Sequence, residues 1–197
     1  MKKTFISLIS SLLLLTSVCL ITVYALENDM PFIDTTKQCN LTIEVLDGTL
    51  PIEGFELSAY KVADIIVEPS HTVRYTPVAG LEGLVDYDGM SVEQSKTAAK
   101  TLEANTSSLS ATVSYTDASG IAQFSDLEPG MYLIVNTKRT MTSLRYMTLS
   151  SFLVSVPLAS KDDMNENIWE YDVKAIPKSV PKLIPDPPYY PPLTGVE

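Results

Sequence analysis

The chain has 197 residues, with 24 acidic and 14 basic side chains, one His, two Cys and a formal net charge of −10 at pH 7. This acidic balance provides no basic surface for nucleic acid, so a nucleic-acid partner is excluded. The length is sufficient for one or two domains with cores of their own.

Residues 1–25 have the pattern of a secretory signal peptide. The chain begins Met-Lys-Lys, carries no charge from residue 4 to residue 25, and has Val23 and Ala25 at the −3 and −1 positions of a cleavage site. A retained membrane anchor is the alternative, because the apolar run is long enough to cross a bilayer. Cleavage removes two lysines and changes the net charge from −10 to −12. The mature chain then keeps Cys39 alone, so no intramolecular disulfide is expected.

The first half of the mature chain predicts two strands and a long loop. Residues 41–46 alternate apolar and polar side chains and end at the turn signal Asp47-Gly48. Residues 54–67 continue the same period of two. Residues 68–89 are rich in Pro, Gly and Asp and are predicted to form a loop.

A short amphipathic helix is predicted over residues 92–104. Ser91 and Gln94 have the spacing of a capping box, in which each side chain bonds the other residue's backbone amide. Helical spacing places four residues on one face: Val92, Ser95, Ala99 and Leu102.

Strands and then a proline-rich tail follow the helix. Turn signals separate strands predicted at 111–115, 122–124, 131–135, 148–157 and 168–176. Short strands with polar turns favour an antiparallel sandwich. From Pro177 onward, frequent prolines predict an extended, polyproline-like spacer without sheet or helix.

Three segments carry a resemblance to a known family. Gly120 to Val135 matches the pattern G-x-A-x-F-x-x-L-x-x-G-x-Y-L, which resembles the immunoglobulin-like domains of Gram-positive pilins and collagen-adhesin B-type repeats. Ser151 to Pro157 is similar to the "FLVSLP" strand of pilin N-terminal domains, and Leu41 to Leu57 to their first two strands. The resemblance implies a mainly β, immunoglobulin-like (prealbumin-like, B-type) antiparallel β-sandwich with one short helix and an extended Pro-rich tail.

Within this fold, Phe124 and Leu127 are expected in the core, and Gly130 is expected to allow a tight turn. The expected organisation is a signal peptide at 1–25, an N-terminal lead-in at 26–39, a pilin domain at 40–178 and a Pro-rich tail at 179–197.

The last predicted strand resembles the pilin motif W-x-x-x-V-x-V-Y-P-K of sortase-assembled pili. The matching residues are Trp169, Val173, Pro177 and Lys178, whereas Ala175 and Ile176 replace the usual Val and Tyr. The resemblance implies that Lys178 is the nucleophile that a sortase joins to another subunit. This reaction needs a reachable, unprotonated amine to attack the acyl-enzyme thioester. A solvated lysine at a strand end is the alternative, and Lys174 and Lys182 are neighbouring amines.

The tail contains Pro191-Pro192-Leu193-Thr194-Gly195, which resembles the sorting signal Leu-Pro-x-Thr-Gly. Pro192, Thr194 and Gly195 match, and Pro191 replaces the usual Leu. The resemblance implies cleavage between Thr194 and Gly195. A chance match in a Pro-rich tail is the alternative. A sorting signal continues into an apolar span and a basic tail, so we expect the natural chain to extend beyond Glu197.

We predict no intramolecular isopeptide bond, no metal and no cofactor. Val45 stands where the family places the reacting lysine, and Asn136 stands where it places the assisting glutamate. His71 has no partner at metal-ligand spacing, and Asp86-Tyr-Asp88 lacks the remaining ligands of a calcium loop. We find no catalytic triad, phosphate loop or dinucleotide fingerprint, so enzymatic activity is not expected.

The resemblance implies a structural subunit of a sortase-assembled pilus at the cell wall, with a sortase, other pilins and peptidoglycan as partners. One domain followed by a stiff tail favours a minor or basal position. The alternative is a wall-anchored adhesin that does not polymerise and binds a host ligand through the loop at 68–89, because rigid sandwiches display recognition on loops.

Overall fold

The computed structural model describes residues 30–69, 72–138, 140–141, 145–177 and 179–183. Its helices are α2 (Val92–Glu103) and the short 3-10 helix η1 (Thr106–Ser108). Its strands are β1 (Cys39–Glu44), β2 (Leu46–Asp47), β3 (Leu50–Pro51), β4 (Glu56–Val67), β5 (Val73–Pro77), β6 (Ala111–Tyr115), β7 (Ile121–Leu127), β8 (Gly130–Lys138), β9 (Thr140–Met141), β10 (Arg145–Leu149), β11 (Phe152–Val156), β12 (Leu158–Lys161), β13 (Asn167–Glu170), β14 (Asp172–Ala175) and β15 (Ser179–Leu183).

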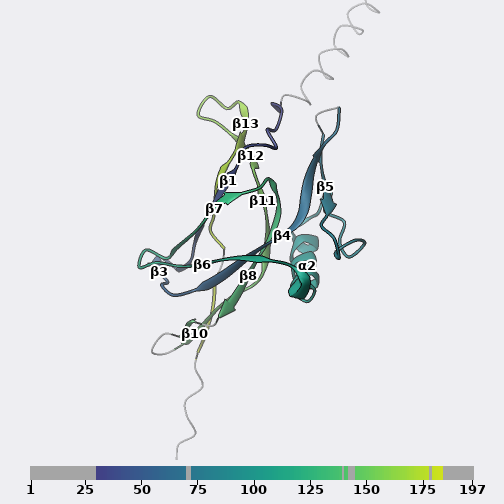
Figure 1. The fold of residues 1–197 in the computed structure, drawn as a ribbon. Coiled ribbons are helices and arrows are strands. Elements are labelled where there is room, and N and C mark those ends of the chain that lie inside the picture. Colours follow the sequence, from purple (N-terminus) through teal and green to yellow (C-terminus); the bar gives the residue numbers. More distant parts are fainter. Residues whose placement is uncertain (1–29, 70–71, 139, 142–144, 178, 184–197) are drawn as a thin grey trace, which may run out of the picture.

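Two sheets form the sandwich (Figure 1). One has the order β14-β1-β7 and the other the order β11-β8-β4-β5, with β6 also paired to β4. The 12 residues of β4 allow its first half to pair with β6 and its second half with β5. The mainly β, sandwich class predicted from the sequence is confirmed.

The core between the sheets follows from the period-two pattern of the strands. On β1, Leu41 and Ile43 are fully buried and face the second sheet. Phe124 and Leu127 on β7 enter the same core, as predicted. Further members come from both sheets: Leu57, Ala59, Tyr132, Ile134, Val156 and Val173.

A third layer covers the outer face of the second sheet. Residues 131–135 of β8 are all buried. Alternate side chains point to opposite faces of the sheet, and both faces are covered. Met131, Leu133 and Val135 belong to a second core, which α2 and the preceding loop complete. The loop and helix contribute Leu81, Tyr87, Ala99 and Leu102. A continuous apolar run is typical of a strand buried on both faces.

The predicted helix and its capping box are confirmed. The Gln94 backbone amide donates to Ser91 Oγ at 3.3 Å, and the Ser91 amide donates to Gln94 Oε1 at 2.8 Å. Ala99 and Leu102 are buried as expected, but Val92 is 75% exposed. Val92 lies two turns before Ala99 on the same face, where the second core no longer covers the helix. Val92 thus shares the face of Ala99 but not its burial.

Two predictions about strands are wrong. The predicted loop at 68–89 contains β5, which pairs antiparallel with β4. The sandwich is not wholly antiparallel, because β1 and β14 pair in parallel. The strand predicted at 168–176 is divided at Tyr171 into β13, which pairs with β12, and β14, which pairs with β1.

The start of the tail is paired rather than free. Residues 179–183 form β15, which pairs antiparallel with β10, so the expectation of no sheet beyond Pro177 is wrong here. Pro181 lies in β15, at the end of its sheet, where a missing backbone donor is tolerated. The predicted division of domains at residue 178 stays a prediction.

Several predicted features lie outside the described residues. These are the signal peptide at 1–25, His71, Lys178, and the sorting-signal residues Pro192, Thr194 and Gly195. Within the described part of the chain, no helix is both long and apolar enough to span a membrane.

Candidate functional site

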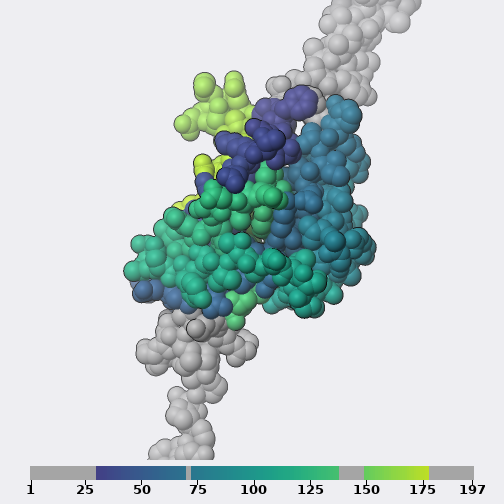
Figure 2. All heavy atoms as spheres, in the orientation of Figure 1, coloured from purple at the N-terminus to yellow at the C-terminus, as the bar shows by residue number. Residues whose placement is uncertain are grey.

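The terminal segment that leads to Lys178 first contacts the N-terminal lead-in. The indole Nε1 of Trp169 donates a hydrogen bond to the carbonyl of Pro31 at 2.8 Å. The hydroxyl of Tyr171 accepts from the Asp34 amide at 2.7 Å and donates to the Asp34 carbonyl at 3.2 Å. The Lys37 ammonium lies 4.2 Å from the Tyr171 ring centre. In Figure 2 the purple lead-in lies directly beside the yellow-green hairpin β12–β13.

Strand β14 is then fixed against β1. Val173 is 1% exposed and lies opposite Leu41 in the parallel register. The Asn40 amide donates to the Tyr171 carbonyl at 2.8 Å, and its side-chain nitrogen donates to Asp172 Oδ1 at 2.6 Å. Backbone pairing, a buried anchor and side-chain contacts thus hold this strand up to its last residues.

Lys174, a neighbouring amine, is already paired. Its Nζ lies 2.6 Å from Glu44 Oε2 on the adjacent strand β1. The structure therefore gives Lys174 an ion-pair partner on the neighbouring strand.

The end of β14 and the two residues after it form one wall of a groove of about 580 Å³. Ala175, Ile176 and Pro177 form this wall, and Lys178 follows directly in the sequence. Helix α2 and the turn between β10 and β11 form the other walls. They contribute Glu93, Lys96, Thr97, Lys100, Ser150, Ser151 and Phe152.

A second groove of about 400 Å³ lies between α2 and the loop that precedes it. Buried Leu81 and Tyr87 anchor this loop, and the Tyr87 hydroxyl donates to the Val62 carbonyl at 3.2 Å. Carboxylates and apolar side chains line the groove, among them Val85, Asp86, Asp88, Met90 and Glu93.

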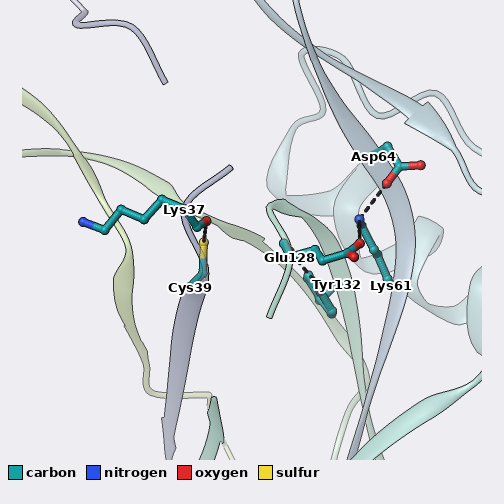
Figure 3. A network of polar contacts seen from close by, with 6 residues as sticks. All are labelled: Lys37, Cys39, Lys61, Asp64, Glu128 and Tyr132. Atoms are coloured by element: carbon teal, nitrogen blue, oxygen red, sulfur yellow. Dashed lines mark hydrogen bonds and ion pairs between the residues drawn. The ribbon is translucent and has the colours of Figure 1, made fainter. Parts of the chain in front are cut away.

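A polar cluster formed by β4 and the turn between β7 and β8 contains two ion pairs of Lys61 (Figure 3). Lys61 Nζ lies 2.7 Å from Asp64 Oδ1 and 2.8 Å from Glu128 Oε2, and its side chain is 23% exposed. Burial alone would lower the pKa of Lys61, but the hydrogen bonds to both carboxylates raise it above its ordinary value. Lys61 is therefore an ammonium at neutral pH and unsuited to attack a carboxyl group.

The two residues from which the absence of an isopeptide bond is predicted, Val45 and Asn136, lie among the described residues. Val45 is fully buried in the core. The Asn136 side-chain nitrogen donates to the Glu56 carbonyl at 3.1 Å. The absence of an intramolecular isopeptide bond stays a prediction.

The predicted absence of a metal site also stays a prediction. Within the described ranges, no group of three or more His, Cys, Asp or Glu side chains is placed to hold a metal ion. Asp88 instead pairs with Arg74 at 3.3 Å, and Asp86 accepts from the Asp88 amide at 3.1 Å.

Sequence reasoning selected residues of the terminal segment, and their role stays a prediction. It selected Trp169, Val173 and Pro177, which the structure places along one segment. It missed Tyr171, although the period of two that links it to Trp169 was an available signal. It also missed the groove, because Lys96 and Lys100 lie far from Pro177 in sequence and only the fold brings them together.

No protein-family model matches the chain, and no curated protein matches it. Its structure is similar to solved Gram-positive pilins. The full-length major pilin SpaD from Corynebacterium diphtheriae has a TM-score of 0.45 and 18% identity, over 75% of this chain and 31% of SpaD. The T6 backbone pilin of Streptococcus pyogenes serotype M6 has a TM-score of 0.45 and 16% identity, over 75% of this chain and 29% of that one.

The SpaB basal pilin from Lactobacillus rhamnosus GG has a TM-score of 0.44 and 19% identity, over 72% of this chain and 95% of SpaB. This chain thus spans about a third of the length of the two long pilins and nearly all of the short one. At these identities the similarity concerns the fold and not activity or partners. Function depends on the residues of the chain itself.

Proposed function

We propose that this chain is a cell-surface structural subunit of a sortase-assembled pilus, in a minor or basal position. Lys178 accepts a neighbouring subunit, and Thr194 is joined to another lysine or to the cell wall. The observation that carries the proposal is the fixation of the segment before Lys178. Trp169 and Val173 anchor this segment to the domain. The segment then continues to Pro177, which lines an open groove.

The chemistry requires no cofactor. The sortase cysteine attacks the carbonyl carbon of the sorting-signal threonine, and the bond to the following glycine breaks with release of a new amino terminus. The neutral amine of Lys178 then attacks the thioester carbonyl. The C–N bond forms, the C–S bond breaks, and the proton lost by the amine restores the cysteine thiol. Binding and positioning are the substrate's contribution.

The proline before Lys178 and the ion pair of Lys174 both support the choice of Lys178 as the acceptor. Lys174 is paired with Glu44. Lys178 instead follows Pro177, whose ring fixes its own backbone φ and disfavours a helical conformation of Ile176.

A wall-anchored adhesin that does not polymerise is the second candidate. The 400 Å³ groove beside the loop favours it, because buried Leu81 and Tyr87 hold that loop in one conformation. A preorganised surface of this kind loses little entropy when a ligand binds.

A transpeptidation assay tests the proposal. The chain is incubated with the pilin sortase and the major pilin of its own organism, and products are read by denaturing gel and intact mass. The wild type is compared with Lys178→Ala, Thr194→Ala and the control Lys174→Ala. We expect an adduct that Lys178→Ala abolishes and that Lys174→Ala leaves unchanged.

The other outcomes separate the candidates. An adduct that survives Lys178→Ala but is lost in Thr194→Ala indicates attachment through the tail alone, as for an adhesin. An absence of adduct from every form, while the major pilin polymerises in the same tube, would contradict the pilus assignment.

A further inference from the structure

We propose that the groove beside Pro177 binds an extended, acidic, proline-containing segment, the stretch that precedes the sorting-signal threonine of the subunit being joined. This inference rests on the proposed function, because it names what lies beside Lys178 during the reaction. It adds a non-covalent docking site on helix α2, remote in sequence from the lysine.

The first argument is the charge of the groove. Its lining contains two lysines, Lys96 and Lys100, and one carboxylate, Glu93. Glu93 is already paired with Lys96 at 3.2 Å. Lys100 has no ion-pair partner within the described ranges, and it follows Lys96 by about one turn of α2. In a chain of net charge −10, the groove is thus a local surface of positive charge.

The second argument is the apolar wall opposite these lysines. Ile176 is 59% exposed, and Phe152 and Pro177 continue the wall. A mixed wall of this type matches a proline-rich segment, which loses little conformational entropy when it binds. The volume of about 580 Å³ is within the range of ordinary ligand sites.

The third argument is a segment with this chemistry in the chain itself. Residues 184–197 contain Asp186 and Glu197, no Lys or Arg, frequent prolines and two tyrosines. Strand β15 starts opposite Leu149, beside the groove, and runs about 13 Å along β10 to Leu183. The proposed occupant is this segment of a second molecule, the subunit being joined.

The test is a binding titration without sortase. The probe is a fluorescent peptide with the sequence of residues 184–190, which lacks Thr194 and Gly195, and the protein is the full chain. Lys96→Glu combined with Lys100→Glu should weaken binding about tenfold, because two attractive contacts become repulsive. Binding should also weaken when salt is raised from about 0.05 to 0.5 M.

Two matched pairs of variants separate the groove from general effects. Lys161→Glu, on hairpin β12–β13, makes the charge change of one of the two groove substitutions, and Ile66→Ser removes a 48% exposed apolar side chain on β4. Neither should change binding, whereas Ile176→Ser should weaken it several-fold. Glu93→Gln should strengthen it, because it removes the carboxylate that opposes an acidic ligand.

The outcomes are distinct from those of the transpeptidation assay. A peptide that does not bind, or that binds equally to the groove variants and their controls, overturns the docking site and leaves Lys178 as an acceptor untouched. Binding that follows the expected pattern, in a chain that forms no adduct, supports the docking site and contradicts the proposed function.

Discussion

Burial lowers the reactivity of the Cys39 thiol. It is fully buried at the start of β1, and desolvation raises the pKa of its thiol to about 11. At pH 8 roughly one thiol in a thousand is then a thiolate, the nucleophilic form. A crosslinking or catalytic role for this residue is thus disfavoured by its surroundings.

We predict that Cys39 in the folded chain reacts with iodoacetamide at pH 8 at least about a hundredfold more slowly than in denaturant. The rate should increase as the pH rises toward 11, because the thiolate fraction increases. Peptide mass mapping over time measures this. Native labelling at the rate of a free thiol would contradict the buried position.

Two features require glycine at position 120: a positive backbone φ and the lack of room for a Cβ atom. Its φ is +73°, and a Cβ at this position would lie 2.6 Å from the Val45 carbonyl oxygen. That oxygen belongs to backbone that cannot move freely, since Val45 is buried and its amide donates to the Gly120 carbonyl at 2.8 Å. Only glycine fits without displacing the backbone at Val45.

We predict that Gly120→Ala lowers the free energy of unfolding by more than about 2 kcal/mol. Gly83→Ala is a matched control, because Gly83 has the same φ of +73° with no atom within 4 Å of a new Cβ. It should cost about 1 kcal/mol, the conformational cost alone. Chemical denaturation of both variants measures the difference, and equal losses would show that the contact with Val45 is unimportant.

At the scale of elements, strand β14 connects the core to the candidate site. Val173 is 1% exposed within the sandwich, and Ile176, three residues later, is 59% exposed on the groove wall. This short segment therefore has a buried anchor, Val173, and an exposed end, Ile176. A substitution at Val173 should affect stability, and a substitution at Ile176 should affect the groove.

We predict that Val173→Ala lowers the free energy of unfolding by about 2 kcal/mol, because it leaves a cavity between the sheets. Ile176→Ala should change it by less than about 0.5 kcal/mol. Hydrogen exchange of residues 172–175 should increase in the first variant alone. Equal effects from both would mean that Val173 is not the anchor of this strand.

The sequence predicted elements that local chemistry determines. The capping of α2 by Ser91 and Gln94 depends on residues three apart, and the alternation of β1 is visible in its own six residues. It did not predict features that distant residues decide. Only the parallel pairing of β14 with β1 explains why the predicted strand at 168–176 changes sheets at Tyr171.

Gly130 illustrates the same limit within a correctly predicted region. The sequence motif indicated a tight turn, but Gly130 is not among the glycines with positive φ. Its constraint is close packing: a Cβ would lie 2.7 Å from the Ala63 carbonyl and from the Lys61 side chain on neighbouring β4. The groove likewise was not predictable, since α2 and the end of β14 meet only after folding.

At the scale of the whole molecule, the three layers give the two faces of the second sheet different roles. Its inner face packs on the sheet that contains β14, and its outer face packs on α2. The helix therefore stands beside both grooves and contributes Glu93 and Thr97 to each. One covering helix thus links the two candidate surfaces.

The order of Lys178, β15 and Thr194 along the chain determines how tension would pass through such a subunit. If both residues are joined to neighbours, a pull on the filament runs from 178 to 194 and bypasses the sandwich. Within the described residues, β15 against β10 is then the only pairing under load. The five residue pairs of that contact would bear the load, while β1 and β14 would stay outside the line of force. A domain outside the line of force has no need of an internal covalent brace.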